Sequence, residues 1–132
     1  MKAVNNEKLE MFLSMGFVKV RVGLHNPLKP EKVIEVDAIA DTGAIYSIVR
    51  GDLLERLRVK PLRRRRFKAF GGYVERDVGE VGMVLLGERR IVPVVFGEEG
   101  DAGVIGVTAL EIFGLEVDVV RGALKEAELL LL

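Results

Sequence analysis

The chain has 132 residues, of which 49% are hydrophobic and 30% are charged, and its formal net charge at pH 7 is zero. This balance indicates one soluble domain with a real core, and it provides no general attraction to nucleic acid or anionic membranes. The chain has no Cys and a single His, His25, so disulfides and thiolate chemistry are excluded, and zinc–histidine or Ser–His sites have almost no candidate residues.

The first segment predicts a short helix over Met1–Ser14, so residues 1–15 form an extension before the first strand. Glu7 and Glu10 lie where a secretory signal peptide would be apolar. No run of about 18 apolar residues follows anywhere in the chain. We therefore expect a cytoplasmic protein without a membrane span.

Two strands are predicted next. Phe17–Leu24 alternates between apolar and basic residues, which is typical of a strand with one buried face. His25–Pro30 is predicted as a loop because it contains two prolines and an asparagine, and a second strand follows over Lys32–Ala40. His25 is either a surface turn residue, the interpretation that we favour, or a ligand.

The most unusual stretch is Val36–Val49, in which Asp41-Thr42-Gly43-Ala44 lies between two apolar runs. Burying a carboxylate is costly unless it is paired, hydrogen-bonded or protonated. Gly43 permits a sharp backbone turn and the close approach of another group. Asp41 is therefore a candidate for chemistry at the end of a strand, and the alternative is a turn aspartate that accepts backbone hydrogen bonds.

The middle of the chain predicts short elements separated by glycines. A short helix is expected over Leu53–Leu57, with Asp52 as its N-cap residue. An extended segment, Arg63–Phe70, leads into a two-residue hairpin turn at Gly71-Gly72. Further strands are predicted at Val74–Val78, Val81–Leu86 and Arg90–Phe96. Strands at this spacing indicate an all-β barrel or sandwich.

Arg63–Arg66 is the strongest local concentration of charge. Alternate side chains of an extended segment point to opposite sides. We therefore favour a solvated edge strand that is protected against aggregation. The alternative is a nucleic-acid-binding patch, which the absence of interleaved aromatic residues disfavours.

The last third of the chain begins with an acidic loop, Glu98–Gly103, which is either solvated, as we favour, or binds a hard cation. Thr108 and Glu111 match the N-cap and N3 positions of a capping box, and Gly114 is expected to end that helix. A strand over Leu115–Val120 and an extended or helical tail, Ala123–Leu132, are predicted to follow. The tail ends in four leucines, Leu129–Leu132, which either contact a partner or pack on their own chain.

Two motifs together resemble the retropepsin-like aspartic proteases, the single-domain class that includes the retroviral proteases. Asp41-Thr42-Gly43-Ala44 resembles their active-site signature. Val104-Ile105-Gly106, followed by the helical pattern Thr108–Phe113, resembles the segment that packs behind the catalytic loop. The resemblance spans Phe17–Val119 within a single domain, 1–132. It implies an all-β, closed or partly closed barrel with one short helix in the C-terminal half.

The resemblance also implies a chemistry in which two aspartates share one proton and activate a water molecule. Because the chain has one Asp-Thr-Gly, it implies a homodimer that hydrolyses a peptide or protein substrate without a metal or cofactor. Asp41 would be catalytic, and Thr42 would form a hydrogen bond across the dimer axis. The Gly43 N–H would hold the carboxylate, and Ala44 would lie against the substrate main chain.

Other family positions carry over in the same way. Ile105 would line a pocket, and Gly106 would let the rear segment approach closely. The flap, a hairpin that closes over the peptide, corresponds to Phe70, Gly71, Gly72 and Tyr73. In retroviral proteases the chain ends interleave between subunits, which would place residues 121–132 at the dimer interface.

The chain departs from the family pattern at two places. Its flap tip has fewer glycines, and Ile45-Tyr46 replaces the acidic residues that follow the alanine in retroviral enzymes. These departures support a second hypothesis, a catalytically silent binding or assembly module with the same fold.

Overall fold

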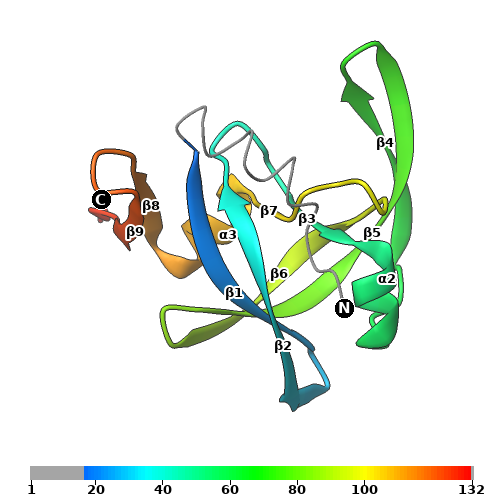
Figure 1. Ribbon diagram of the computed structural model, residues 1–132, viewed down its shortest axis with the longest axis horizontal. Helices are drawn as coiled ribbons and strands as arrows, with labels where there is room; N and C mark the ends of the chain where they lie inside the picture. Colours follow the sequence, from blue (N-terminus) through cyan, green and yellow to red (C-terminus); the bar gives the residue numbers. More distant parts are fainter. Residues whose placement is uncertain (1–16, 132) are drawn as a thin grey trace.

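The computed structural model describes residues 17–131. The helix predicted over Met1–Ser14 and the final residue, Leu132, lie outside the described residues. The elements in chain order are β1 (Val18–Asn26), β2 (Lys29–Ala40), β3 (Ser47–Arg50), α2 (Gly51–Arg56), β4 (Arg63–Ala69), β5 (Gly72–Leu85), β6 (Glu88–Gly97), β7 (Val104–Ile105), α3 (Val107–Phe113), β8 (Leu115–Asp118) and β9 (Ala123–Glu126) (Figure 1). Strands dominate, as predicted. No helix in this part of the chain has the length and apolar character that crossing a bilayer requires.

Seven of the strands form one sheet in the order β1-β2-β7-β3-β6-β5-β4, and β1 also pairs with β5. That additional pairing, with Leu24 opposite Met83, closes six strands into a ring. The closure is weak around β7, which pairs with β3 only through Ile48 opposite Val104. The prediction of a closed or partly closed barrel is confirmed, and β4 lies outside the ring as the edge strand that the arginine run predicted.

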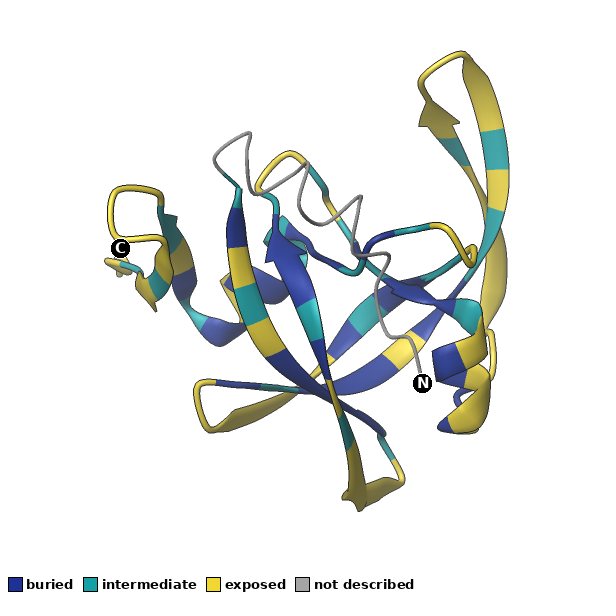
Figure 2. Ribbon diagram, viewed as in Figure 1, coloured by how far each residue is buried: buried dark blue, intermediate teal, exposed yellow. Residues whose placement is uncertain are grey.

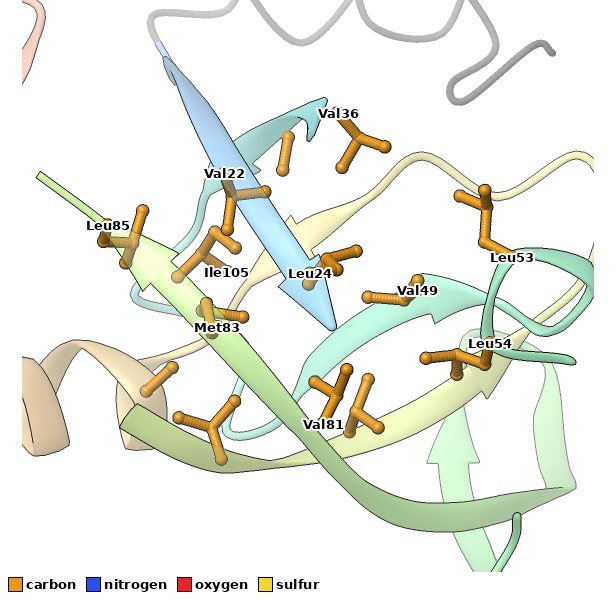
Figure 3. Close-up of a cluster of buried hydrophobic side chains, with 14 of the residues drawn as sticks. Val22, Leu24, Val36, Val49, Leu53, Leu54, Val81, Met83, Leu85 and Ile105 are labelled. Atoms are coloured by element: carbon orange, nitrogen blue, oxygen red, sulfur yellow. The ribbon is translucent and has the colours of Figure 1, made fainter. Parts of the chain in front are cut away.

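Aliphatic side chains fill the barrel (Figure 3). Val81, Met83 and Leu85 alternate along β5, and all three are buried, so one face of the last part of this strand belongs to the core. Leu53 and Leu54 of α2 join the same cluster. Each fully buried aliphatic side chain of this size contributes about 1.5–3 kcal/mol to the stability of the fold.

His25 does not lie in a surface loop, and this prediction was wrong. β1 and β2 extend through the predicted loop and leave only a turn at Pro27-Leu28. His25 is buried, and its Nδ1 lies 2.8 Å from the carbonyl oxygen of Asn26. Its cross-strand partner is Gly82, where an added Cβ would overlap the imidazole ring. The space for the ring therefore comes from a glycine that is distant in sequence.

The predicted break between Val74–Val78 and Val81–Leu86 is also absent, because β5 is one continuous strand of 14 residues. Gly79 lies inside it, where a Cβ would come within 3.1 Å of the Lys60 carbonyl oxygen. This glycine allows a close backbone approach and does not end the strand. At the other end of the hairpin, Ala69 pairs with Gly72, so the turn residues are Phe70-Gly71, one position earlier than predicted.

Helix α2 begins two residues before the predicted Leu53–Leu57, and α3 begins one residue before the predicted pattern Thr108–Phe113. Neither helix has a side-chain cap. Asp52 lies inside α2 and forms an ion pair with Arg50 at 2.6 Å. Gly106 is the N-cap residue of α3, so Thr108 and Glu111 do not form the predicted capping box. Gly114 ends α3 with a φ of 68°, in agreement with the sequence.

The C-terminal residues form a second, two-stranded sheet of β8 and β9, with Val117 opposite Leu124. The predicted strand Leu115–Val120 therefore ends at Asp118, and part of the predicted tail is β9. Three leucines beyond β9 are exposed, namely Leu129, Leu130 and Leu131. The alternative in which they pack on their own chain is wrong for these three residues, because the described residues leave them 76–97% exposed.

Candidate active site

Asp41 follows β2 directly and is half-buried at the start of a tight turn. Its backbone N–H donates a hydrogen bond to the Ile105 carbonyl oxygen at 3.0 Å, which ties the turn to β7. The Gly43 N–H donates to Asp41 Oδ1 at 2.8 Å, and the Ala44 N–H donates to the Asp41 carbonyl oxygen at 3.1 Å. The carboxylate is therefore folded back over its own turn, with the Gly43 contact that the resemblance implied.

The N-terminus of α3 supports this loop from behind. The N–H groups of the first turn of a helix have no partner within the helix. Here the Val107 N–H donates to the Ala44 carbonyl oxygen at 2.7 Å, and the Thr108 N–H donates to the Ile45 carbonyl oxygen at 3.0 Å. The loop backbone takes the place of a side-chain cap, which explains why the predicted capping box is not needed.

Gly106 makes this contact between loop and helix possible. A Cβ at this position would lie 2.6 Å from the Tyr46 carbonyl oxygen and 2.8 Å from the Ile45 carbonyl oxygen. Its own N–H donates to the buried hydroxyl of Ser47 at 3.0 Å. The close approach predicted for Gly106 is present, and Ser47 satisfies an amide that would otherwise be buried without a partner.

A groove of about 700 Å³ lies between the Asp41 loop and the β4–β5 hairpin. The hairpin extends beyond the barrel in Figure 1, and Figure 2 shows that most of its outer part is exposed. Tyr46 connects the two walls, because its ring packs edge-on against Phe67 with 6.4 Å between ring centroids. The volume lies within the usual range of roughly 300–1,000 Å³ for ligand sites.

Some of the predicted site residues line this groove, and others do not. Asp41 and Ala44 line it, whereas Thr42 lies at a smaller hollow beside Phe17 and Val117. Ile105 does not line the groove, because it is buried in the core, and its neighbour Val104 takes that place. Successive side chains of a strand point to opposite faces. In β7 the side chain of Val104 therefore faces the groove, and that of Ile105 faces the core.

The four predicted flap residues lie at the tip of the β4–β5 hairpin, where Phe70 and Tyr73 are exposed. In the single chain the groove is lined by lower parts of the hairpin instead. The role of Phe70, Gly71, Gly72 and Tyr73 as a cover for substrate stays a prediction.

Tyr46 and Arg65 are among the groove residues that sequence reasoning missed. Tyr46 was noted only as a departure from the family, and Arg65 only as part of a charged run. The alternation of β4 was the available signal, because it places Arg65 on the same face as Phe67. Within residues 17–131, no group of three or more His, Asp or Glu side chains could hold a metal ion.

No protein-family model matches the chain, and no curated protein matches it by sequence. Solved structures do match. The protease of simian foamy virus (mac) has a TM-score of 0.54 at 17% identity, covering 72% of this chain and 93% of the viral one. The EIAV protease complexed with the inhibitor HBY-793 has a TM-score of 0.57 at 18% identity, covering 86% of this chain and 91% of the viral one. At these identities the likeness shows the fold.

Proposed function

We propose that this chain, which has a retropepsin-like fold, is an aspartic endopeptidase that acts as a homodimer. A water molecule is activated between two Asp41 carboxyl groups, one from each copy, and attacks the carbonyl carbon of a peptide bond. The observation that carries the proposal is the position of Asp41, half-buried on the wall of a groove of about 700 Å³, with its carboxylate held by the Gly43 N–H.

The chemistry follows from placing two carboxyl groups side by side. Two carboxylates about 3 Å apart cannot both stay ionised, so the pair shares one proton. The ionised member accepts a proton from the water, while the protonated member donates a hydrogen bond to the carbonyl oxygen under attack. The departing amine nitrogen then takes up a proton as the bond breaks. This mechanism requires no metal and no cofactor.

The dimer is part of the proposal because the chain has one Asp-Thr-Gly sequence. The second carboxyl group must come from a second copy related by a two-fold axis. Thr42 and Gly43 are exposed, so the turn next to Asp41 is accessible to such a partner. Thr42 would then form the hydrogen bond across the axis that the resemblance implies.

The test is peptide cleavage by the wild type and by Asp41→Asn, assayed between about pH 3 and pH 7 because the dyad must hold one proton. The amide has the shape of the carboxyl group but cannot accept the water's proton, so kcat/KM should fall roughly a thousandfold or more. A statine peptide, which mimics the tetrahedral transition state, should inhibit the wild type.

Asp37→Asn is the matched control, because Asp37 lies on β2, four residues before Asp41, and its carboxylate pairs with Arg21 at the surface. This variant should keep its activity. A folded dimer that binds the statine peptide but cleaves no peptide at any pH would contradict the hydrolase proposal and identify a silent binding module.

A further inference from the structure

We infer that the groove selects peptides that carry an acidic side chain near the scissile bond, and that Arg65 recognises this side chain. The inference rests on the proposed function of the same groove, and it adds the class of substrate.

The inner face of the β4–β5 hairpin is basic. Arg65 and Phe67 alternate along β4, and their cross-strand partners on β5 are Arg76 and Val74. All four of these residues line the groove. Lys68 and Ala69 of the hairpin also line the groove, so this wall combines apolar and cationic side chains and has no carboxylate.

The opposite face of the hairpin differs in charge. Arg64 points away from the groove and lies 3.2 Å from the Asp77 carboxylate and 3.6 Å from the Glu75 carboxylate. Arg66 lies over the ring of Tyr73, with 4.3 Å to the ring centroid. The two outward arginines, Arg64 and Arg66, therefore already have partners on their own hairpin. The run Arg63–Arg66 is not one continuous basic patch.

The two inner-face arginines, Arg65 and Arg76, differ in their ion-pair partners. Arg76 forms an ion pair with Glu98 at 3.1 Å. Arg65 and Lys68 also line the groove, and neither has an ion-pair partner within residues 17–131. Asp101 lines the groove as well, but its carboxylate accepts the Glu98 N–H at 2.7 Å. Arg65 is therefore the inner-face cation that is available to a ligand. Lys68 also lines the groove, and alternation along β4 places it on the same face as Arg64 and Arg66.

Arg65 has one polar contact beside the groove. Its Nη1 lies 3.5 Å from the Tyr46 hydroxyl oxygen, at the outer limit of a hydrogen bond, and Tyr46 packs against Phe67. A guanidinium has five N–H donors, so this contact leaves a free edge that can bind a carboxylate with two hydrogen bonds. Lys68 adds charge without that planar geometry.

The charge distribution also sets where the acidic side chain binds. The Asp41 pair carries one negative charge and repels a substrate carboxylate, whereas the hairpin wall attracts it. The acidic residue of the substrate should therefore flank the scissile bond without lying next to the two Asp41 carboxyl groups. In a two-fold dimer each copy supplies one Arg65, so the preference should exist on both sides of the bond.

Two peptides that differ only by Glu or Gln at flanking positions provide the test. Their binding to the Asp41→Asn protein is measured by fluorescence anisotropy, and their kcat/KM values are measured with the wild type. We expect the Glu peptide to be favoured roughly three- to thirtyfold in both assays, and less so at high salt. Arg65→Gln should reduce the ratio to about twofold or less. Arg64→Gln removes the same charge from the outer face and should preserve the ratio.

The outcomes separate this inference from the proposed hydrolysis. If cleavage depends on Asp41 but kcat/KM is equal for both peptides, the substrate preference is overturned and the proposed hydrolysis is supported. If the Glu peptide binds more tightly but neither peptide is cleaved, the preference is supported and the proposed hydrolysis is overturned. Equal or undetectable binding of both peptides, or a ratio that Arg64→Gln reduces as much as Arg65→Gln, overturns the inference.

Discussion

Gly106 connects the rear of the barrel to the Asp41 loop, and no other residue fits there without movement of the backbone. A Cβ would lie 2.6 Å from the Tyr46 carbonyl oxygen, which is backbone and cannot rotate away. We expect Gly106→Ala to lower the free energy of unfolding by about 1–3 kcal/mol, as overpacking does elsewhere. Denaturant titration followed by circular dichroism measures this change.

The matched control for that experiment is Gly100→Ala, because a Cβ at Gly100 would meet no atom within 4 Å. Gly100→Ala should change stability by only a few tenths of a kcal/mol. Equal midpoints for the two variants would contradict the close approach. Peptide cleavage by Gly106→Ala should also decrease, since the loop that carries Asp41 must shift.

His25 and Gly82 form a second steric pair, between β1 and β5. Gly82→Ala should destabilise the protein by about 1–3 kcal/mol because the new methyl group overlaps the buried imidazole. In a His25→Ala background the ring is gone, and the same substitution should cost much less. A double-mutant cycle of unfolding free energies measures this coupling. Additive effects would show that the ring and the glycine do not share the space.

Local sequence predicted some residues of the site and not others. Asp41 and Gly43 could be predicted because the turn, the carboxylate and its amide donor lie within three consecutive residues. The burial of Ile105 in the site, and of His25 elsewhere in the barrel, could not be predicted, because it depends on strands that are distant in sequence. In a two-residue strand such as β7, no local pattern shows which side chain faces the core. Either Val104 or Ile105 could therefore have faced the groove.

At the scale of elements, the outer part of the β4–β5 hairpin has less strand pairing than the barrel. Residues 72–77 of β5 pair only with β4, whereas residues 82–84 lie between β6 and β1. Backbone amides in 72–77 should therefore exchange with deuterium faster than those in 82–84. Binding of a statine peptide should slow exchange at Phe70–Tyr73 if the tip closes over the groove.

Hydrogen exchange with mass spectrometry provides this measurement, and the Pro27-Leu28 turn is its internal control. That turn lies at the end of the β1–β2 hairpin, and Leu28 is 90% exposed. Inhibitor binding should leave its exchange unchanged. Unchanged exchange at Phe70–Tyr73 with the inhibitor bound would contradict the assignment of these residues as a lid.

Sequence patterns predicted strands better than helix boundaries, and the reason is physical. Alternating burial leaves a periodic signal in a segment such as Phe17–Leu24, whatever the partner strand is. A helix N-terminus needs acceptors for its free N–H groups, and these can come from any part of the chain. For α3 they come from Ala44 and Ile45, so Thr108 had the right residue type but not the role.

At the scale of the whole molecule, closure of the barrel leaves the C-terminal leucines outside the core. Figure 1 shows β8 and β9 at the opposite end of the molecule from the β4–β5 hairpin. Leu129, Leu130 and Leu131 follow β9 and are exposed, as are Val119 and Val120 at the turn before it. Exposed apolar residues in a cluster favour association with a partner. The prediction that this tail forms the dimer interface follows from both the leucine run and its exposure.

Serine at all three of these leucine positions should therefore weaken the dimer at least about tenfold while the fold is retained. Sedimentation velocity across a range of concentrations measures the dissociation constant. Leu28→Ser is the control, since Leu28 is equally exposed but lies at the β1–β2 turn. A dimer of unchanged affinity in the triple variant would place the interface elsewhere.

A mixing experiment tests whether the active site needs both copies. Random pairing of wild type with an equal amount of Asp41→Asn puts about half of the wild-type subunits into mixed dimers, each with one Asp41. Because a single carboxyl group cannot act as both proton acceptor and hydrogen-bond donor, activity per wild-type subunit should fall to about half. Asp41→Asn protein that also carries the three serine substitutions pairs poorly, so adding it should leave the activity nearly unchanged. Activity that is insensitive to both additions would mean that each chain catalyses alone, which a single Asp-Thr-Gly does not allow in this mechanism.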